Sequence, residues 1–267
     1  CGCGLGPGHR RGRGGGADTE RCGTKSDKLL NMILQPEQPT VALHARNAAQ
    51  SAHPELWRGL VGAWAPALGY QGGALCDASG KKNSGELKGG AKWTSSQHGN
   101  ALELSAATND WVDWGTSDPS AKDLTIASWL YFNEDLNDFY GILSKRNGFT
   151  ASTMRWQWFV EGKIRFGPRF VFEQPDSNTV FREFLLPLQK WTHAVLVHED
   201  GGQDKLYING TLIRSKSAIT FGSDTTAQNR IGANKDGSEV WDGLIAEIEV
   251  YNQALTARQV DALYATP

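Results

Sequence analysis

Cysteine is scarce in the body of this 267-residue chain. Three of its four cysteines, Cys1, Cys3 and Cys22, lie near the N-terminus, which leaves Cys76 alone in the remainder. A single cysteine cannot close a disulfide within the body. No second Cys/His pair follows Cys1 and Cys3 at the spacing of a zinc finger. Cysteine usage therefore indicates little about how the fold is stabilised.

Long apolar runs and an excess of charge are also absent. No run approaches the roughly 20 apolar residues that a membrane-spanning helix needs. The net charge of −2 argues against a general nucleic-acid or anionic-membrane partner. No basic stretch followed by an apolar stretch and a small-residue cleavage site is visible, so we see no signal peptide. These absences predict a chain with no membrane span and no nucleic-acid partner.

The first part of the chain differs in texture from the rest. Residues 1–31 contain nine glycines and six arginines or lysines without hydrophobic periodicity. They are interpreted either as a disordered Gly/Arg-rich tail or as an upstream artefact preceding a true start at Met32. Residues 32–59 mix prolines with short apolar stretches, which suits an extended N-terminal arm. We expect residues 60–267 to form one domain.

From Leu60 onward, short apolar runs alternate with Gly, Asn, Asp and Ser, a pattern typical of antiparallel sandwiches and barrels. Asn209-Gly210 is a strong signal for a hairpin turn. No alternation of strands with helices appears, so a parallel sheet is not expected. The strand-like segments are 101–104, 125–132, 155–160, 194–197, 205–208 and 244–251. Only residues 256–264 suit a helix, with Thr256 as its N-cap.

Several of these segments carry motifs of a known family. In chain order they are Gly59 to Trp64, Asp77-Ala78-Ser79-Gly80, Asn109-Asp110-Trp111-Val112, Thr125 to Trp129, Trp191-Thr192-His193, Tyr207-Ile208-Asn209-Gly210, and Asp242 to Thr256. Together they resemble the LamG-like jelly-roll family, of the laminin G/concanavalin A-like lectin/glucanase superfamily. The resemblance runs from about Leu60 to Tyr264. It implies an all-β, two-sheet antiparallel β-sandwich with one short C-terminal helix.

A narrower resemblance concerns the segment that leads into the domain. His53-Pro54-Glu55-Leu56-Trp57-Arg58-Gly59-Leu60-Val61-Gly62-Ala63-Trp64 is similar to the start of a subgroup found in phage and prophage-like genomes. The start Met of that subgroup lies just upstream, which agrees with Met32 as the start here. This resemblance implies a protein of a virion surface.

Catalysis is not supported by the residues. Sandwich-fold glycoside hydrolases need two carboxylates about 5–5.5 Å apart, which alternate residues on one strand provide. Their E-x-D-x-x-E run is missing, and we interpret the spaced pair Glu247 and Glu249 as solvent-facing side chains. No G-x-S-x-G motif and no phosphate-loop pattern occurs either. The sequence therefore predicts a protein that is not an enzyme.

Calcium is the cofactor that the resemblance implies, because many related sandwiches hold one Ca²⁺ in rim loops. Asp77, Asp110 and Asp242 lie in loops that are able to converge, and they are the predicted metal ligands. Short polar residues in turns are also common turn formers, which is the alternative interpretation.

The ten tryptophans divide by context. Trp64, Trp129 and Trp191 fall within or beside strand motifs and are predicted to be core. The others that we weighed lie nearer loops or in aromatic stretches, namely Trp111, Trp114, Trp156, Trp158 and Trp241. An exposed indole stacks well on a sugar ring while a nearby amide binds hydroxyls. Trp111, Trp114 and Asn109 are therefore the predicted ligand-binding residues.

Three functions remain open at this point. The first is a non-catalytic binding or adhesion module for a glycan or another cell-surface ligand, placed outside the cell or on a virion. The second is a purely structural decoration or tail protein of a phage particle, in contact with other virion proteins. The third is a sandwich-fold glycoside hydrolase, which the missing carboxylate run disfavours. Fold alone does not establish sugar binding.

Overall fold

The computed structural model describes residues 53–64, 74–120, 122–134, 138–162, 167–234 and 237–265. The predicted tail at 1–31 and residues 32–52 of the predicted arm lie outside the described residues. The last part of that arm contains the short 3-10 helix η1 (Pro54–Leu56), in which Leu56 is buried, so it is not extended throughout. None of the helices in the described ranges has the length and apolar composition needed to span a membrane.

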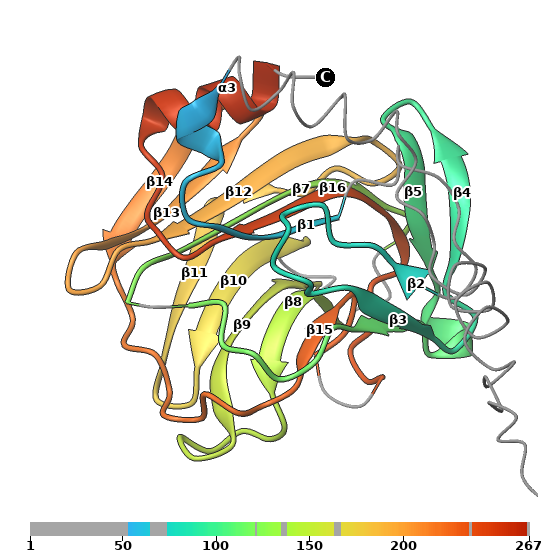
Figure 1. Cartoon of the computed structure of the whole chain (residues 1–267), viewed down its shortest axis with the longest axis horizontal. Coiled ribbons are helices and arrows are strands. Elements are labelled where there is room, and N and C mark those ends of the chain that lie inside the picture. The colour runs from blue at the N-terminus through green and yellow to red at the C-terminus, as the bar shows by residue number, and fades with distance from the viewer. Residues whose placement is uncertain are drawn as a thin grey trace, which may run out of the picture. The chain divides into compact units, whose positions relative to one another are not determined.

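Two eight-stranded sheets form the domain (Figure 1). The first, sheet A, has the order β14-β13-β12-β7-β16-β5-β4, and β1 pairs with β16 beside it. Its strands are β1 (Leu60–Trp64), β4 (Lys92–Ser96), β5 (Gly99–Leu104), β7 (Leu124–Phe132), β12 (Thr192–His198), β13 (Gln203–Ile208), β14 (Thr211–Ser217) and β16 (Gly243–Tyr251).

The second, sheet B, has the order β11-β10-β9-β8-β15-β6-β3-β2. Its strands are β2 (Ala74–Leu75), β3 (Gly85–Lys88), β6 (Trp111–Asp113), β8 (Phe139–Arg146), β9 (Met154–Glu161), β10 (Arg169–Gln174), β11 (Ser177–Leu185) and β15 (Asn229–Ile231). Neighbouring strands in both sheets run antiparallel. With the short C-terminal helix α3 (Ala257–Ala265), this confirms the predicted fold class.

The main core lies between the two sheets because alternate residues of each strand point inward. On β7, Ile126, Leu130 and Phe132 face this core, whereas Trp129 and Tyr131 point to the outer face of sheet A. Four tryptophans are almost completely buried in the same core: Trp64, Trp156, Trp158 and Trp241. Burial of several aromatic side chains supplies much of the apolar area that stabilises the sandwich.

Helix α3 covers part of the outer face of sheet A (Figure 1). Its start is a capping box, because the Gln259 amide N–H donates to the Thr256 hydroxyl at 3.4 Å while the Gln259 side chain accepts from the Thr256 N–H at 2.9 Å. Val260 and Leu255 are buried against Tyr207 and other outward residues of the sheet. The predicted N-cap at Thr256 is confirmed.

The turn between β13 and β14 follows the sequence signal directly. Asn209 and Gly210 both have positive φ, at 48° and 77°, and Ile208 pairs with Thr211 across them. Two positive φ values in a two-residue loop define the hairpin turn that Asn-Gly favours.

One strand departs from its predicted alternation. The pattern predicts that Leu244, Ala246, Ile248 and Val250 share the core face of β16. Ile248 and Val250 do face the core, but so does Ile245. The register shifts between Ala246 and Glu249, and Glu247 has a φ of 49°. This β-bulge inserts an extra residue, so Leu244 and Ala246 lie on the opposite face.

A buried lysine joins the strands of sheet B to two rim loops. The Lys145 ammonium donates to the carbonyl oxygens of Thr116 at 2.9 Å, Ser117 at 3.2 Å and Ala227 at 2.8 Å. Burial lowers the pKa of Lys145 to about 8, while the nearby Asp118 and Asp224 oppose that shift. The amine therefore stays mostly charged at neutral pH and links both loops to β8.

Candidate functional site

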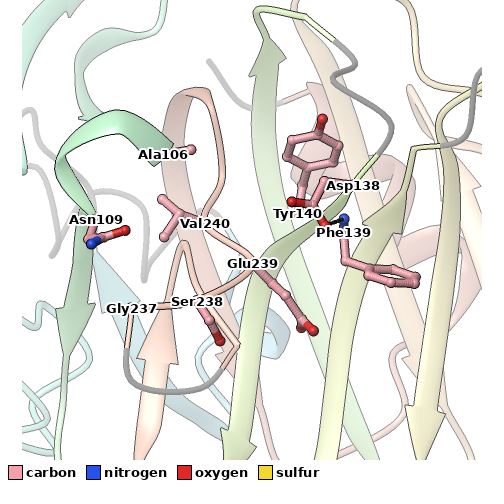
Figure 2. A pocket seen from close by; sticks show the side chains of 9 residues that line it. All are labelled: Ala106, Asn109, Asp138, Phe139, Tyr140, Gly237, Ser238, Glu239 and Val240. Carbon is pink, nitrogen blue, oxygen red and sulfur yellow. Dashed lines mark hydrogen bonds between the residues drawn. The ribbon is translucent and has the colours of Figure 1, made fainter.

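A pocket of about 170 Å³ opens where three distant segments meet at one end of the strands. One wall is the short 3-10 helix η3 (Ala106–Thr108) with Asn109, a second is the start of β8, and the third is the loop before β16 (Figure 2). The lining residues are Ala106, Asn109, Asp138, Phe139, Tyr140, Gly237, Ser238, Glu239 and Val240.

The first wall is a tight turn whose ends are capped. The Ser105 hydroxyl accepts from the Ala107 N–H at 3.2 Å, which is typical of an N-cap. Asn109 ends η3 in the left-handed conformation with a φ of 52°. Asn tolerates this conformation better than most residues. Asn109 is exposed, and its amide is available at the mouth of the pocket.

Two aspartates hold η3 in place. The Asp110 carboxylate accepts from the backbone N–H groups of Gly90 and Ser105. The Asp242 carboxylate accepts from the backbone of Ala106 and from the Asn133 side chain. Burial, together with the nearby Glu134, raises the pKa of Asp242 above its ordinary value. Both residues therefore position the Asn109 wall of the pocket.

The third wall lies directly against the outer face of β8. A Cβ atom added at Gly141 would come within 2.5 Å of the Ala233 backbone, so only glycine permits this approach. The Ser144 hydroxyl donates to the carbonyl oxygens of Ala233 and Asn234, at 2.9 and 2.7 Å. The loop 232–234 is thus fixed to the strand before it reaches the pocket.

Glu239 connects this wall to the buried charges of sheet B. Its carboxylate pairs with the buried Arg146 guanidinium at 3.0 Å and accepts from the Asn234 amide. The Glu239 carbonyl also accepts from the Gly141 N–H at 2.6 Å. Glu239 has a φ of 54°, which is uncommon for this residue type and occurs where surrounding contacts enforce it.

The pocket is lined mainly by hydrogen-bonding groups. Asn109, Ser238 and Asp138 supply polar side chains. Phe139 packs edge-to-face on Phe159 and the buried Tyr140 on Phe132, so their rings support the wall without facing the pocket. One oxygen of Asp138 already accepts from the Phe139 N–H at 2.8 Å. Glu239 is already engaged by Arg146 and Asn234, so Asp138 is the lining carboxylate with an oxygen left to accept from a ligand. Such a site is suited to holding a polyhydroxylated ligand.

The predicted ligand-binding residues have different positions. Asn109 lines the pocket. Trp111 is half-buried, and its ring lies against Gly237, where an added Cβ would be 2.4 Å from it, so it supports the third wall from beside the pocket. Trp114 is only 3% exposed and meets Trp64 edge-to-face with ring centroids 4.8 Å apart. The prediction for Trp114 is corrected, because its ring offers no face to a ligand.

The predicted calcium ligands do not form a metal site. Within the described ranges, no group of three or more His, Cys, Asp or Glu side chains is arranged to hold a metal ion. Asp77 lies with Ala63, Ser79 and Asn83, whose N–H groups donate to its two oxygens at 2.8–3.0 Å. Asp110 and Asp242 anchor η3 instead. Backbone N–H groups thus use the lone pairs that a calcium ion would need.

Two tryptophans predicted to be core lie on the outer face of sheet A. Trp129 and Trp191 are half-buried, and His98 from the β4–β5 turn stacks on Trp129 at 3.8 Å. Conversely Trp156, Trp158 and Trp241, which we placed nearer loops or in aromatic stretches, are core residues. Both faces of these strands carry large side chains, so composition does not reveal which face a tryptophan occupies.

The carboxylates of β16 are less exposed than predicted. Glu247 and Glu249 are both partly buried, and the Tyr251 hydroxyl donates to Glu249 at 2.9 Å. Burial raises the pKa of Glu249 to about 7, and the nearby Glu247 adds to that shift. The Trp129 side chain donates to Glu247. Helix α3 and the aromatic residues of the outer face make this side of β16 drier than an open sheet surface.

Of the residues that line the pocket, only Asn109 was predicted from the sequence to bind a ligand. Asp138 to Tyr140 and Gly237 to Val240 are about 100 positions apart, and β-pairing through β15 brings them together. No local spacing marks such a convergence. The one available signal was the glycine-bounded loop between Ile231 and Trp241, because loops at strand ends commonly form sites.

A family model described as the concanavalin A-like lectin/glucanases superfamily matches residues 106–261, which is more than half of the chain. The chain belongs to this superfamily. No curated protein sequence matches it.

Solved structures show the same fold at low identity. Domain 4 of AbnA, a GH43 extracellular arabinanase from Geobacillus stearothermophilus solved with arabinotriose, has a TM-score of 0.58 and 18% identity, covering 77% of this chain and 98% of that domain. The binding domain of Paraclostridial Mosquitocidal Protein 1 has a TM-score of 0.59 and 16% identity, and the match covers 78% of this chain and 52% of that one. A structure of botulinum neurotoxin type C, a toxin whose cell entry is described as dependent on two ganglioside molecules, has a TM-score of 0.58 and 16% identity. The match covers 80% of this chain and 52% of the toxin chain. This chain spans about half the length of the two toxin structures.

Proposed function

We propose that this protein is a non-catalytic glycan-binding module that holds a single sugar unit, at the end or on a branch of a glycan, in the rim pocket. The observation that carries the proposal is the combination of the Asn109 amide with the Asp138 carboxylate and the exposed Ser238 in one pre-formed pocket. At about 30 Å³ per water molecule, its 170 Å³ has room for about six waters. That size suits one sugar unit, with the rest of a glycan outside the pocket.

The comparisons support this ligand class. An arabinanase domain of the same fold is described with arabinotriose, and a neurotoxin structure is described with gangliosides. The pocket offers no paired acid and nucleophile, since Glu239 is bound to Arg146, and the carboxylates Glu247 and Glu249 on β16 do not line it. We therefore infer adhesion to a glycan outside the cell, without hydrolysis.

The phage-particle alternative lacks support of this kind. Neither the family model nor the neighbours named above point to a virion protein. A structural role also leaves the polar lining of the pocket unexplained. Glycan binding accounts for it, and it is the function we favour.

A blocking substitution tests the proposal. Ala106→Trp places an indole in the pocket from an exposed position on η3, while Ala107→Trp adds the same group next to it but outside the lining. Asn109→Gly removes the amide and keeps the left-handed backbone accessible. We expect Ala106→Trp to abolish binding on an array of neutral and sialylated glycans, Asn109→Gly to weaken it about tenfold, and Ala107→Trp to bind like the wild type.

Melting temperatures of all variants serve as the folding control, with Asn252→Ala as a distant exposed asparagine. Equal binding by Ala106→Trp and wild type would show that the pocket is not the site. Release of reducing sugar from any polysaccharide would overturn the non-catalytic assignment.

A further inference from the structure

A row of outward side chains crosses four strands of sheet A and ends at Trp191, directly before β12. Leu244 on β16 pairs with Tyr131 on β7 and with Glu103 on β5, and Glu103 pairs with Lys92 on β4. Trp191 extends the row on the other side of Tyr131, with ring centroids 5.5 Å apart. At about 4.8 Å per strand, the row spans roughly 19 Å.

The row lies beyond the part of the outer face that α3 covers. Each of its five residues is half-buried or exposed, whereas Ala127 and Val195, further along the same strands, are buried in the cluster under α3. Outward positions of an antiparallel sheet are usually polar when they face solvent. Three large apolar or aromatic side chains in succession depart from that rule and mark an interaction surface.

The aromatic end of the row is partly exposed. Trp191 is half-buried, and the rings of Tyr131 and His98 lie beside it at interplanar angles of 54° and 72°. At the other end, Lys92 and Glu103 form an exposed ion pair at 3.1 Å, which offers donors and acceptors without net charge. A neutral chain of sugar rings matches both ends, through stacking and hydroxyl hydrogen bonds.

The row also begins beside the rim pocket. Glu103 is two residues before Ser105, the N-cap of η3, and Leu244 is two residues after Asp242, which anchors Ala106. The pocket and the row therefore lie at the same end of the sandwich. A glycan whose terminal unit occupies the pocket has further units to place, and the row continues from the residues that hold η3.

We propose that the row from Trp191 to Lys92 is a second binding surface for the same glycan, and that it receives the units of an extended neutral chain that the pocket cannot hold. This inference rests on the proposed function. Binding at both surfaces makes the second contact intramolecular, so affinity rises with chain length without any change in the pocket.

Series of oligosaccharides of increasing length (ladders) test whether the row binds the further units of a glycan. Cello-, xylo- and arabino-oligosaccharides from disaccharide to octasaccharide are titrated by calorimetry into the full chain, into Trp191→Ala and into Tyr131→Ala. For the ladder that binds, we expect each variant to weaken octasaccharide binding about tenfold, which corresponds to about 1.4 kcal/mol, and to leave disaccharide binding within about twofold. Trp191→Phe keeps an aromatic face and should restore most of the lost affinity.

Tyr264→Ala is the matched control, since Tyr264 is an aromatic residue with 39% exposure that lies on α3 outside the row. If Trp191→Ala and Tyr131→Ala bind the octasaccharide as strongly as the wild type does, the second surface is overturned while the pocket proposal stays intact. Loss of disaccharide binding only in Ala106→Trp distinguishes the two surfaces. Absence of binding by every ladder would reject the second surface, while the glycan array decides the pocket proposal separately. Self-association lost in Trp191→Ala would assign the row to a second copy of the chain.

Discussion

A single carboxylic acid illustrates how the outer face of sheet A alters side-chain chemistry. Glu249 lies on β16 between β1 and β7, where it pairs with Ala63 and Ala127, and it accepts a hydrogen bond from the Tyr251 hydroxyl. Desolvation disfavours its ionised form and raises its pKa to about 7. The hydrogen bond from Tyr251 lowers the pKa, but not enough to offset burial.

This shift predicts a pH dependence of stability. Below about pH 4.5 Glu249 is protonated in both the native and unfolded states, so it adds no pH dependence there. As the pH rises from about 4.5 to about 7, the unfolded chain ionises first, and the free energy of unfolding falls by up to about 3 kcal/mol. Glu249→Gln should remove this fall. Urea unfolding between pH 4 and pH 8 measures it, with exposed Glu86→Gln as control, and parallel profiles for wild type and Glu249→Gln would contradict the assignment.

Tryptophan placement shows where residue-level reasoning fails. Trp64 was predicted to be core and is buried. Trp129 and Trp191 were also predicted to be core but are half-buried on the outer face, whereas Trp114 and Trp241, which were placed nearer loops, are buried in the core. The two-residue repeat of a strand determines only that alternate side chains lie on the same face of the sheet. Which face is the core depends on pairing and on bulges that form only in the assembled sheet.

At the level of elements, the β-bulge at Glu247 sets which side chains of β16 reach the core. Its φ of 49° lies in the left-handed region, where a β-branched residue is strongly disfavoured and glycine is not. The bulge also directs Glu247 toward the Trp129 side chain. A regular strand in this place would send Ile248 and Val250 to the wrong face.

The bulge makes a prediction that reverses ordinary strand preferences. Glu247→Val should be less stable than Glu247→Gly by about 2 kcal/mol, although valine is the better strand former elsewhere. Both variants lose the hydrogen bond from Trp129, so that loss cancels in the comparison. Denaturant unfolding measures the difference. As a control, Thr94→Val on β4 should be more stable than Thr94→Gly. If glycine were the more stable substitution at both positions, the role of the bulge would be contradicted.

The elements themselves were largely predictable. Asn209-Gly210 and Thr256 with Gln259 are local signals, and each produced the expected turn or cap. The bulge has no such signal, because Glu is not a residue that marks positive φ. Among pocket residues only Asn109 was foreseen, since it belongs to a family motif, whereas Glu239 depends on contacts with Arg146 across the fold.

At the level of the whole molecule, buried carboxylates in the described residues join distant segments by accepting hydrogen bonds from backbone N–H groups. Asp77 ties β1 to the segment that contains Ser79 and Asn83, and Asp110 ties Ser105 to Gly90. Each carboxylate therefore uses its lone pairs on backbone N–H groups of the segments that it joins.

We therefore expect calcium to leave stability unchanged. Bound Ca²⁺ at about 100 times its dissociation constant would add about 2.7 kcal/mol and raise the melting temperature by several degrees. Calorimetric melting of the full chain in millimolar CaCl₂ and in excess chelator should instead coincide. A reproducible rise of several degrees in calcium, lost in Asp110→Asn, would contradict the assignment of Asp110 as a loop anchor.

The buried ammonium of Lys145 has a consequence for where such a module is able to work. It occupies three carbonyl oxygens from two rim loops, much as a bound cation would, but it is covalently attached to β8. Dilution, chelators or a change of ionic composition in the surrounding fluid cannot remove it. The two loops that it joins keep their arrangement in ion-poor and ion-rich surroundings alike, and only a pH well above about 8 would discharge the link.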